Sequence, residues 1–219
     1  MDTLRHLGLE AYRLRLLRGL DDLLRSFGWS RLAGVDEAGR GCLAGPVVAA
    51  AVVVDAEHSL PGVDDSKMLR AGDRTHLSRQ IRDTAFAWNI ALATPAEIDR
   101  LNILEATRLA MGRALAGLAL RPHCALVDAV RIPGLEFPCL SLVRGDIVSY
   151  SVACASILAK AERDRMMAEL DQIYPHYGFA RHKGYAAAEH RRALADHGPS
   201  PEHRLTFRSV VPRAAEVHH

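Results

Sequence analysis

The feature that most constrains the fold is an uninterrupted apolar run from Pro46 to Val54, which after the proline consists only of valines and alanines. Its nine residues are less than half of what a membrane-spanning helix needs. A dense apolar run of this length is typical of a central strand that is buried on both faces. The sequence therefore predicts a layered domain built around a sheet rather than a membrane span.

Segments with helical and strand patterns alternate around this run. Residues 1–31, the lead-in, carry leucines at helical spacing with arginines between them, and Gly28 ends the pattern. We expect the apolar face of the lead-in to pack on the domain. Further strands are expected at 31–36, 86–93, 125–127 and 138–143, and further helices at 73–84 (capped by Asp73), 95–118 (with a capping box at Thr94–Glu97), 147–170 and 186–197. This order favours a mixed α/β sheet over a bundle or a sandwich.

Composition narrows the class of protein. The 219-residue chain is 49% apolar and 25% charged, which excludes a largely disordered chain and leaves room for one or two domains. Its N-terminus lacks the continuous apolar segment of a secretory signal. No CxxC spacing occurs among Cys42, Cys124, Cys139 and Cys154, so we expect reduced thiols and a cytoplasmic protein. A net charge of +2 disfavours a uniformly basic protein that coats DNA.

Lysine is rare in this chain. Arginine supplies 25 of the 28 basic residues, and lysine occurs only as Lys67, Lys160 and Lys183. A lysine is a compact point charge that arginine does not always replace beside a phosphate or a carboxylate. We therefore treat the three lysines as candidates for such contacts, with chance retention as the alternative.

Two adjacent carboxylates, Asp36 and Glu37, follow an apolar segment and are surrounded by glycines. Acidic groups at the end of a buried strand are costly unless a cation or hydrogen bonds hold them, and carboxylate oxygens suit Mg²⁺ or Mn²⁺. Successive strand residues point to opposite faces. One site can thus use both carboxylates only if the strand ends or bulges there, or if Glu37 also offers its backbone carbonyl. The alternative is a charged strand end in solvent.

Three further aspartates are candidates. Asp128 follows the buried Ala125–Val127 strand directly, at the strand end where α/β folds place their sites. Asp146 precedes a helix. A helix cap or turn explains either residue equally well. Asp164 lies between Arg163 and Arg165, and a surface ion pair is its simpler explanation.

Two loops have features of nucleic-acid contacts. The glycines of Gly39-Arg40-Gly41 allow a ligand to come close to the backbone N–H groups, and Arg40 places a positive charge beside them. Both features suit the binding of a phosphodiester. Residues 177–185 interleave aromatic and basic side chains and end in Lys183-Gly184-Tyr185. A small aromatic core under a loop is the alternative for the second segment.

Together these segments resemble ribonuclease HII. The motifs that carry the resemblance are Gly34-Val35-Asp36-Glu37-Ala38-Gly39-Arg40-Gly41, Leu43 to Ala50, Asp65-Ser66-Lys67, Val127-Asp128, Gly145-Asp146, Ala155 to Lys160, Arg163-Asp164, Tyr177-Gly178-Phe179, His182 to Tyr185, and Gly198 to Arg204. They cover roughly residues 32–210 in order and include all three lysines, but not the lead-in.

The resemblance implies an RNase H-like fold, with a five-stranded mixed sheet, flanking helices and a helical C-terminal part. We expect an N-terminal helical extension over 1–31, a catalytic domain over 32–211 with its helical part from about 165, and a tail over 212–219. The implied activity is endonucleolytic cleavage of RNA in RNA/DNA hybrids and at single ribonucleotides in duplex DNA, leaving 3′-hydroxyl and 5′-phosphate ends. We expect a monomeric enzyme that does not bind membranes, and the sequence does not identify a replication partner.

The resemblance also implies roles for individual residues. Asp36, Glu37, Asp128 and Asp146 match the family's catalytic carboxylates, which bind two divalent ions, Mn²⁺ or Mg²⁺, when substrate is present. Gly39, Arg40 and Gly41 match the loop that contacts the ribose 2′-hydroxyl, and Tyr185 matches the tyrosine at the RNA–DNA junction. We expect Lys67, Lys160 and Lys183 to contact substrate or neutralise charge nearby.

The sequence departs from the family pattern at three places. Cys42 replaces a proline, Met68 replaces a second lysine, and Ala129-Val130 replaces the Gly-Asn common in bacterial members. All four carboxylates are present. Two alternatives stay open: another RNase H-like metal-dependent nuclease, and a catalytically inactive module that binds duplexes.

Overall fold

The computed structural model describes the backbone of residues 2–211 and the side chains of residues 7–211, so the expected tail at 212–219 lies outside the described residues. Its centre is a mixed five-stranded sheet in the order β3-β2-β1-β4-β5. The strands are β1 Leu32–Ala38, β2 Val47–Val53, β3 Ala87–Ala93, β4 Cys124–Asp128 and β5 Cys139–Leu142. β2 is antiparallel to both β1 and β3, whereas β1, β4 and β5 are parallel. The expected mixed α/β architecture is confirmed.

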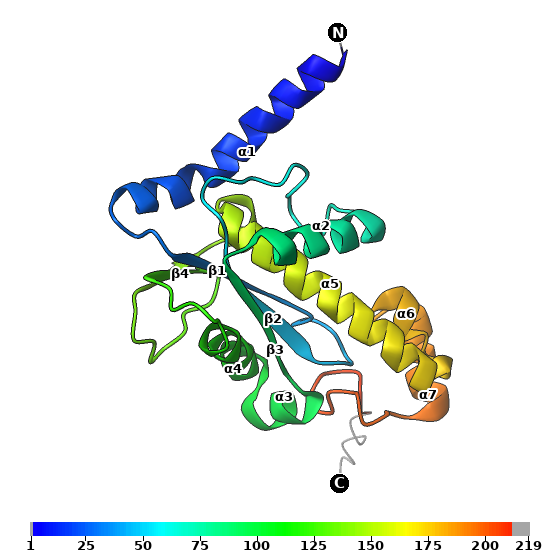
Figure 1. Ribbon diagram of the computed structural model, residues 1–219. Coiled ribbons are helices and arrows are strands. Elements are labelled where there is room, and N and C mark those ends of the chain that lie inside the picture. Colours follow the sequence, from blue (N-terminus) through cyan, green and yellow to red (C-terminus); the bar gives the residue numbers. More distant parts are fainter. Residues whose placement is uncertain (1, 212–219) are drawn as a thin grey trace.

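Helices cover both faces of the sheet (Figure 1). They are α1 Asp2–Ser26, α2 Ala71–Thr84, α3 Pro95–Leu101, α4 Ile103–Ala116, α5 Tyr150–Ile173, α6 Phe179–His182 and α7 Ala188–His197. Figure 1 shows α5 along one face and α4 on the other, with α6 and α7 beside the far end of α5. The segment from Phe179 to His197 thus forms the expected helical C-terminal part.

The strand predicted at Pro46–Val54 is β2, and every residue in it is buried. Val47, Ala49, Ala51 and Val53 belong to the core that contains α4 residues, and Ala50 and Val52 to the core that contains α5 residues. Both faces of β2 are therefore covered, which explains why this strand lacks polar alternation.

The N-terminal half of α5 lies unusually close to β1. A Cβ atom built on Gly34 would lie 2.0 Å from the backbone carbon of Ser151 and 2.5 Å from the Val152 nitrogen. Only glycine permits this approach. Since Asp36 is two residues further along the strand, it faces the same helix.

The lead-in packs on the domain through part of its apolar face, whereas Leu7, Leu9 and Leu16 are exposed. Leu14 and Leu17 of α1 are buried in the core beside α5. The carboxylate of Asp21, which is fully buried, accepts hydrogen bonds from the backbone N–H groups of Tyr150 and Ser151 at 3.2 and 3.1 Å. An acidic side chain of α1 therefore stabilises the N-terminus of α5.

Two expected helices differ in detail. The stretch predicted at 95–118 is two helices, because Asn102 has a φ of 70° and its side chain caps α4. The capping box of Thr94 and Glu97 is confirmed. Asp73 was expected to cap its helix, but α2 begins at Ala71, so Asp73 lies in its first turn and Arg70 occupies the N-cap position.

Candidate active site

Three parallel strands bring the candidate carboxylates to one edge of the sheet. Asp36 and Glu37 lie near the C-terminal end of β1, and Asp128 is the last residue of β4. Asp146 lies in a 3₁₀ turn, Gly145–Ile147, shortly after β5. The carboxyl ends of parallel strands are where α/β folds form their sites, so this convergence follows from the topology.

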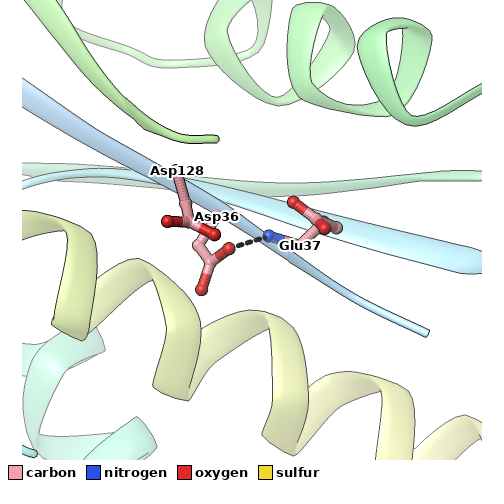
Figure 2. Close-up of side chains that lie close together, drawn as sticks. All are labelled: Asp36, Glu37 and Asp128. Carbon is pink, nitrogen blue, oxygen red and sulfur yellow. Dashed lines mark hydrogen bonds between the residues drawn. The ribbon is translucent and has the colours of Figure 1, made fainter. Parts of the chain in front are cut away.

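Asp36, Glu37 and Asp128 form a compact cluster, with one carboxylate oxygen from each lying within 4.8 Å of the others. Figure 2 shows Asp36 and Asp128 side by side, with the Glu37 backbone N–H donating to Asp36 Oδ1 at 2.7 Å. The described β1–β2 pairing continues regularly to Ala38, so the bulge that we considered is not needed. Instead, the β1–β4 ladder ends at Val35 and Val127, which leaves both carboxylates free to reach the open strand end.

Burial makes this cluster electrostatically unfavourable without a cation. Burial raises the pKa of Asp36 well above its ordinary value, and the neighbouring Glu37 charge raises it further. Burial also raises the pKa of Glu37 to about 7, although Arg40 opposes the shift. Glu37 Oε2 is buried without a hydrogen-bond partner among the described residues. Clustered oxygen donors with an unused buried acceptor fit a hard divalent cation.

Asp146 lies beside this cluster rather than inside it. Its Oδ2 atom is 3.6 Å from Lys67 Nζ. The N–H of the preceding residue, Gly145, donates to Asp128 Oδ1 at 2.6 Å. Burial raises the pKa of Asp146, and Lys67 lowers it. Of the four expected carboxylates, the structure thus groups three tightly and links the fourth to them through Gly145 and Lys67.

A pair of serines supports Asp36. Ser156 of α5 interacts with the Asp36 carboxylate and opposes the rise in its pKa, and the Ser156 hydroxyl lies 2.9 Å from that of Ser66. Ser66 precedes Lys67, so the same contact fixes the loop that carries this lysine. Both serines lie within the family motifs, but the sequence pattern indicates no role for either.

The Gly39-Arg40-Gly41 loop borders the cluster directly. Arg40 forms an ion pair with Glu37 Oε1 at 3.3 Å. Gly39 has a φ of 98°, and a Cβ atom on it would lie 1.9 Å from Arg163 Nε. The loop glycine is therefore required by its backbone conformation and by the packing of Arg163 beneath it.

The other two lysines and Asp164 lie next to each other, outside the carboxylate cluster. Lys160 pairs with Asp164 at 2.7 Å, and Arg74 pairs with it at 3.1 Å. Lys183 Nζ lies 3.4 Å from the Asp164 backbone oxygen. The expected ion pair of Asp164 exists, but it is largely buried and involves neither Arg163 nor Arg165.

The aromatic residues of the second loop divide into two groups. Tyr177 and Phe179 are buried and stacked, with ring centroids 5.2 Å apart, so the small-core alternative is correct for them. Tyr185 is 47% exposed, and Lys160 Nζ lies 5.8 Å from its ring centroid. Its side chain interacts with the buried Cys42 thiol. Tyr185 is thus available for an external contact.

Comparison with known proteins identifies the family. The family model described as Ribonuclease HII matches residues 33–210. The chain belongs to the ribonuclease HII family. It is 50% identical over 202 residues to a ribonuclease HII of Desulfitobacterium hafniense, covering 92% of this chain and 78% of that protein. It is 55% identical over 180 residues to one of Paracidovorax citrulli, covering 82% and 75%.

Structural comparison agrees with this family assignment. The crystal structure of ribonuclease H2 from Pyrococcus horikoshii OT3 matches with a TM-score of 0.72 and 29% identity, covering 82% of this chain and 95% of that one. The protein is therefore a type 2 ribonuclease H with the RNase H-like fold, a nuclease that acts on RNA/DNA hybrids. Its acidic cluster is compatible with divalent metal ions. Among the helices that the structure describes, none is both long and apolar enough to cross a membrane.

Proposed function

We propose that this enzyme also incises duplex DNA on the 5′ side of single embedded ribonucleotides, leaving 3′-hydroxyl and 5′-phosphate ends. The observation that carries the proposal is the buried cluster of Asp36, Glu37 and Asp128, which is flanked by Arg40, together with the half-exposed Tyr185, whose loop contacts the loop that follows Arg40. Cleavage of an internal phosphodiester needs a site that concentrates negative charge for metal ions and also contacts the sugar on either side of the cut.

The four carboxylates, Asp36, Glu37, Asp128 and Asp146, would hold two divalent ions, Mg²⁺ or Mn²⁺, with substrate bound. Bound there, such ions supply an activated water and stabilise the leaving oxygen. Asp36 is the best candidate for a shared ligand, because it is next to Glu37 in sequence and beside Asp128 in space.

The surrounding side chains would bind and orient the substrate. The Gly39-Arg40-Gly41 loop would contact the ribonucleotide, whose 2′-hydroxyl distinguishes RNA from DNA. The Tyr185 ring would stack on the following deoxyribose. Lys67 pairs with Asp146 in the structure and would move or share this contact when the phosphate enters. Lys160 and Lys183, beside Tyr185 and Asp164, would contact the backbone.

The described chain carries all of these groups itself, so we propose a monomeric enzyme. Its free cysteines suit the reducing cytoplasm, where we place it. A single site on one chain also predicts that activity is proportional to enzyme concentration.

The decisive experiment is cleavage of a labelled duplex with one ribonucleotide, in Mg²⁺ and in Mn²⁺, with the cut mapped at single-nucleotide resolution. Matched controls are the same duplex without the ribonucleotide and a continuous RNA/DNA hybrid. We expect one cut on the 5′ side of the ribonucleotide and no cut in the all-DNA control. Cleavage of the all-DNA duplex would instead indicate a different RNase H-like nuclease, and binding without cleavage would indicate an inactive module.

A further inference from the structure

Two buried arginines, Arg163 and Arg204, lie beneath the loops that border the candidate site. Both side chains are fully buried. Among the described residues, no carboxylate lies within ion-pair distance of either guanidinium. A buried charge without a counter-ion is costly, so two neighbouring ones call for an explanation. Burial, together with the Arg163 charge, lowers the pKa of Arg204 to about 10, which still leaves it protonated at neutral pH.

Every hydrogen bond that these guanidinium groups donate goes to a backbone carbonyl. Arg204 donates to the oxygens of Gly39 at 2.7 Å, Arg40 at 2.8 Å and Gly45 at 2.8 and 3.0 Å. Through these bonds, a residue 164 positions away along the chain holds the Gly39-Arg40-Gly41 loop. The C-terminal segment that carries Arg204 lies beside α3 and is joined to the loop after β1 by the Ala44–His203 bridge (Figure 1).

Arg163 connects this loop to the second one. It donates to the oxygens of Ala44, Pro46 and Lys183 at 3.1, 3.1 and 2.9 Å. The two loops also contact each other directly, because the Leu43 N–H donates to the Gly184 oxygen at 2.8 Å. Arg40 and Tyr185 are therefore presented from one unit whose interior contains two positive charges.

We propose that Arg204 and Arg163 are positioning residues for substrate and that the phosphodiester backbone of the bound duplex is their missing counter-charge. Their carbonyl contacts fix the loops that hold Arg40 and Tyr185. Their charge, which no direct ion pair among the described residues neutralises although Asp99 raises the pKa of Arg204 from further away, attracts the phosphates beside the ribonucleotide. This inference rests on the proposed function, because it assumes that the two loops bind the duplex.

The test separates charge from geometry with two substitutions of one residue. Arg204→Lys keeps the charge but cannot make the same set of hydrogen bonds, whereas Arg204→Gln loses the charge as well. A matched control is Arg121→Gln, on an exposed arginine that precedes β4 at the opposite edge of the sheet. Each variant is first checked for folding by circular dichroism and thermal unfolding. The binding constant for the single-ribonucleotide duplex is then measured without divalent ions, and kcat and KM are measured with Mn²⁺.

We expect Arg204→Gln to weaken binding about tenfold, as expected for a unit charge within about 10 Å of a phosphate at an effective dielectric constant of about 20. Arg204→Lys should bind within about threefold of the wild type but lose kcat, because charge is kept while loop geometry is not. Wild-type binding by a folded Arg204→Gln, or equal binding losses in both variants, would overturn the inference. Failure of the wild type to cut at the ribonucleotide would instead overturn the proposed function.

Discussion

At the scale of single residues, the carboxylate cluster combines burial with like charge. Asp36 and Glu37 both have pKa values above their ordinary range because burial penalises the charged form. Such a cluster destabilises the metal-free protein, and cations bound there would relieve the strain.

Substituting Asp128 should separate catalysis from binding. Asp128→Asn keeps the size of the side chain but removes one charge of the cluster, so we expect loss of cleavage with little change in affinity for the duplex. Because repulsion is relieved, the metal-free variant should be at least as stable as the wild type. The measurements are kcat in saturating Mn²⁺, duplex affinity and Tm. Near-wild-type turnover would exclude Asp128 as a ligand.

The raised pKa of Glu37 predicts a pH-dependent response to metal. An acid whose pKa is raised by folding stabilises the folded state at low pH, and this contribution is lost as the pH rises from 4.5 to about 7. Metal ions compete with protons for the same oxygens. The increase in Tm on adding Mn²⁺ should therefore be larger at pH 8 than at pH 6. An equal increase at both pH values, or the same increase in Asp128→Asn, would contradict the prediction.

Tyr185 should determine the preference for a junction. Its exposed ring can stack on a deoxyribose, which is flatter and more apolar than a ribose. Stacking contacts are typically worth about 1–3 kcal/mol, which corresponds to a change of roughly 5- to 150-fold in rate or affinity. Tyr185→Ala should slow cleavage at a single ribonucleotide by this factor and affect a continuous hybrid less. Tyr185→Phe should keep most of the rate. The readout is the ratio of kcat/KM for the two substrates, and an unchanged ratio in Tyr185→Ala would assign the ring a structural role.

At the scale of elements, the contact between α1 and α5 links the lead-in to the site. Asp21 caps α5, whose N-terminal half packs on Gly34 and carries Ser156 to Asp36. The family motifs assign the lead-in no role, since all of them lie beyond it. The structure shows that it supplies buried leucines and a helix cap, although it contributes none of the candidate site residues.

Removing this cap should reduce stability more than chemistry. Asp21→Ala leaves two buried N–H groups without acceptors, so we expect a loss of about 1–3 kcal/mol in the free energy of unfolding. At a temperature where the variant is folded, kcat should stay within about threefold of the wild type. Asp22→Ala, on the exposed neighbour, is the control. Unchanged stability in Asp21→Ala would show that α5 does not need this contact.

At the scale of the whole molecule, a pair of buried histidines joins the C-terminal segment to the second loop. His190 Nδ1 lies 2.8 Å from the Tyr185 oxygen, and its Nε2 atom lies 3.0 Å from His203 Nε2. His203 Nδ1 accepts from the Ser200 N–H at 2.9 Å. This chain of bonds requires both rings to be neutral, with His190 donating to the carbonyl and His203 donating to His190.

Protonation of this pair should weaken the fold in acid. Burial lowers the pKa of His203 from 6.5 to about 4 and also lowers that of His190. A base whose pKa is lowered by folding stabilises the folded state at pH values above the pKa that it has in the unfolded chain. This contribution to the free energy of unfolding, up to about 3 kcal/mol for His203, is lost as the pH falls from about 6.5 to about 4. Urea unfolding between pH 7.5 and 4.5 should show a smaller decrease for His203→Gln than for the wild type. Parallel curves would contradict this assignment.

The sequence by itself determined the fold class, the central strand and the candidate carboxylates. The apolar run of β2 can be removed from water only if both faces of the strand are buried. Acidic residues at the end of a buried strand are energetically costly, and this cost indicates a functional site. The break between α3 and α4 was not predicted, although Asn102 followed by Glu105 is a local signal for a helix N-terminus, and its side chain does cap α4. The motifs nevertheless named every candidate residue around the cluster.

Only the tertiary structure decided which groups meet. The position at which the β1–β4 ladder ends decides which side chains meet. Because of it, Asp36, Glu37 and Asp128 form one cluster, while Asp146 pairs with Lys67. The roles of Asp21, Arg163 and Arg204 were likewise undetectable, because their partners are mostly backbone groups far away in the sequence. Carbonyl and N–H groups are the same in every residue, so a side chain that binds them leaves no matching pattern in the sequence. Such contacts are created by folding itself.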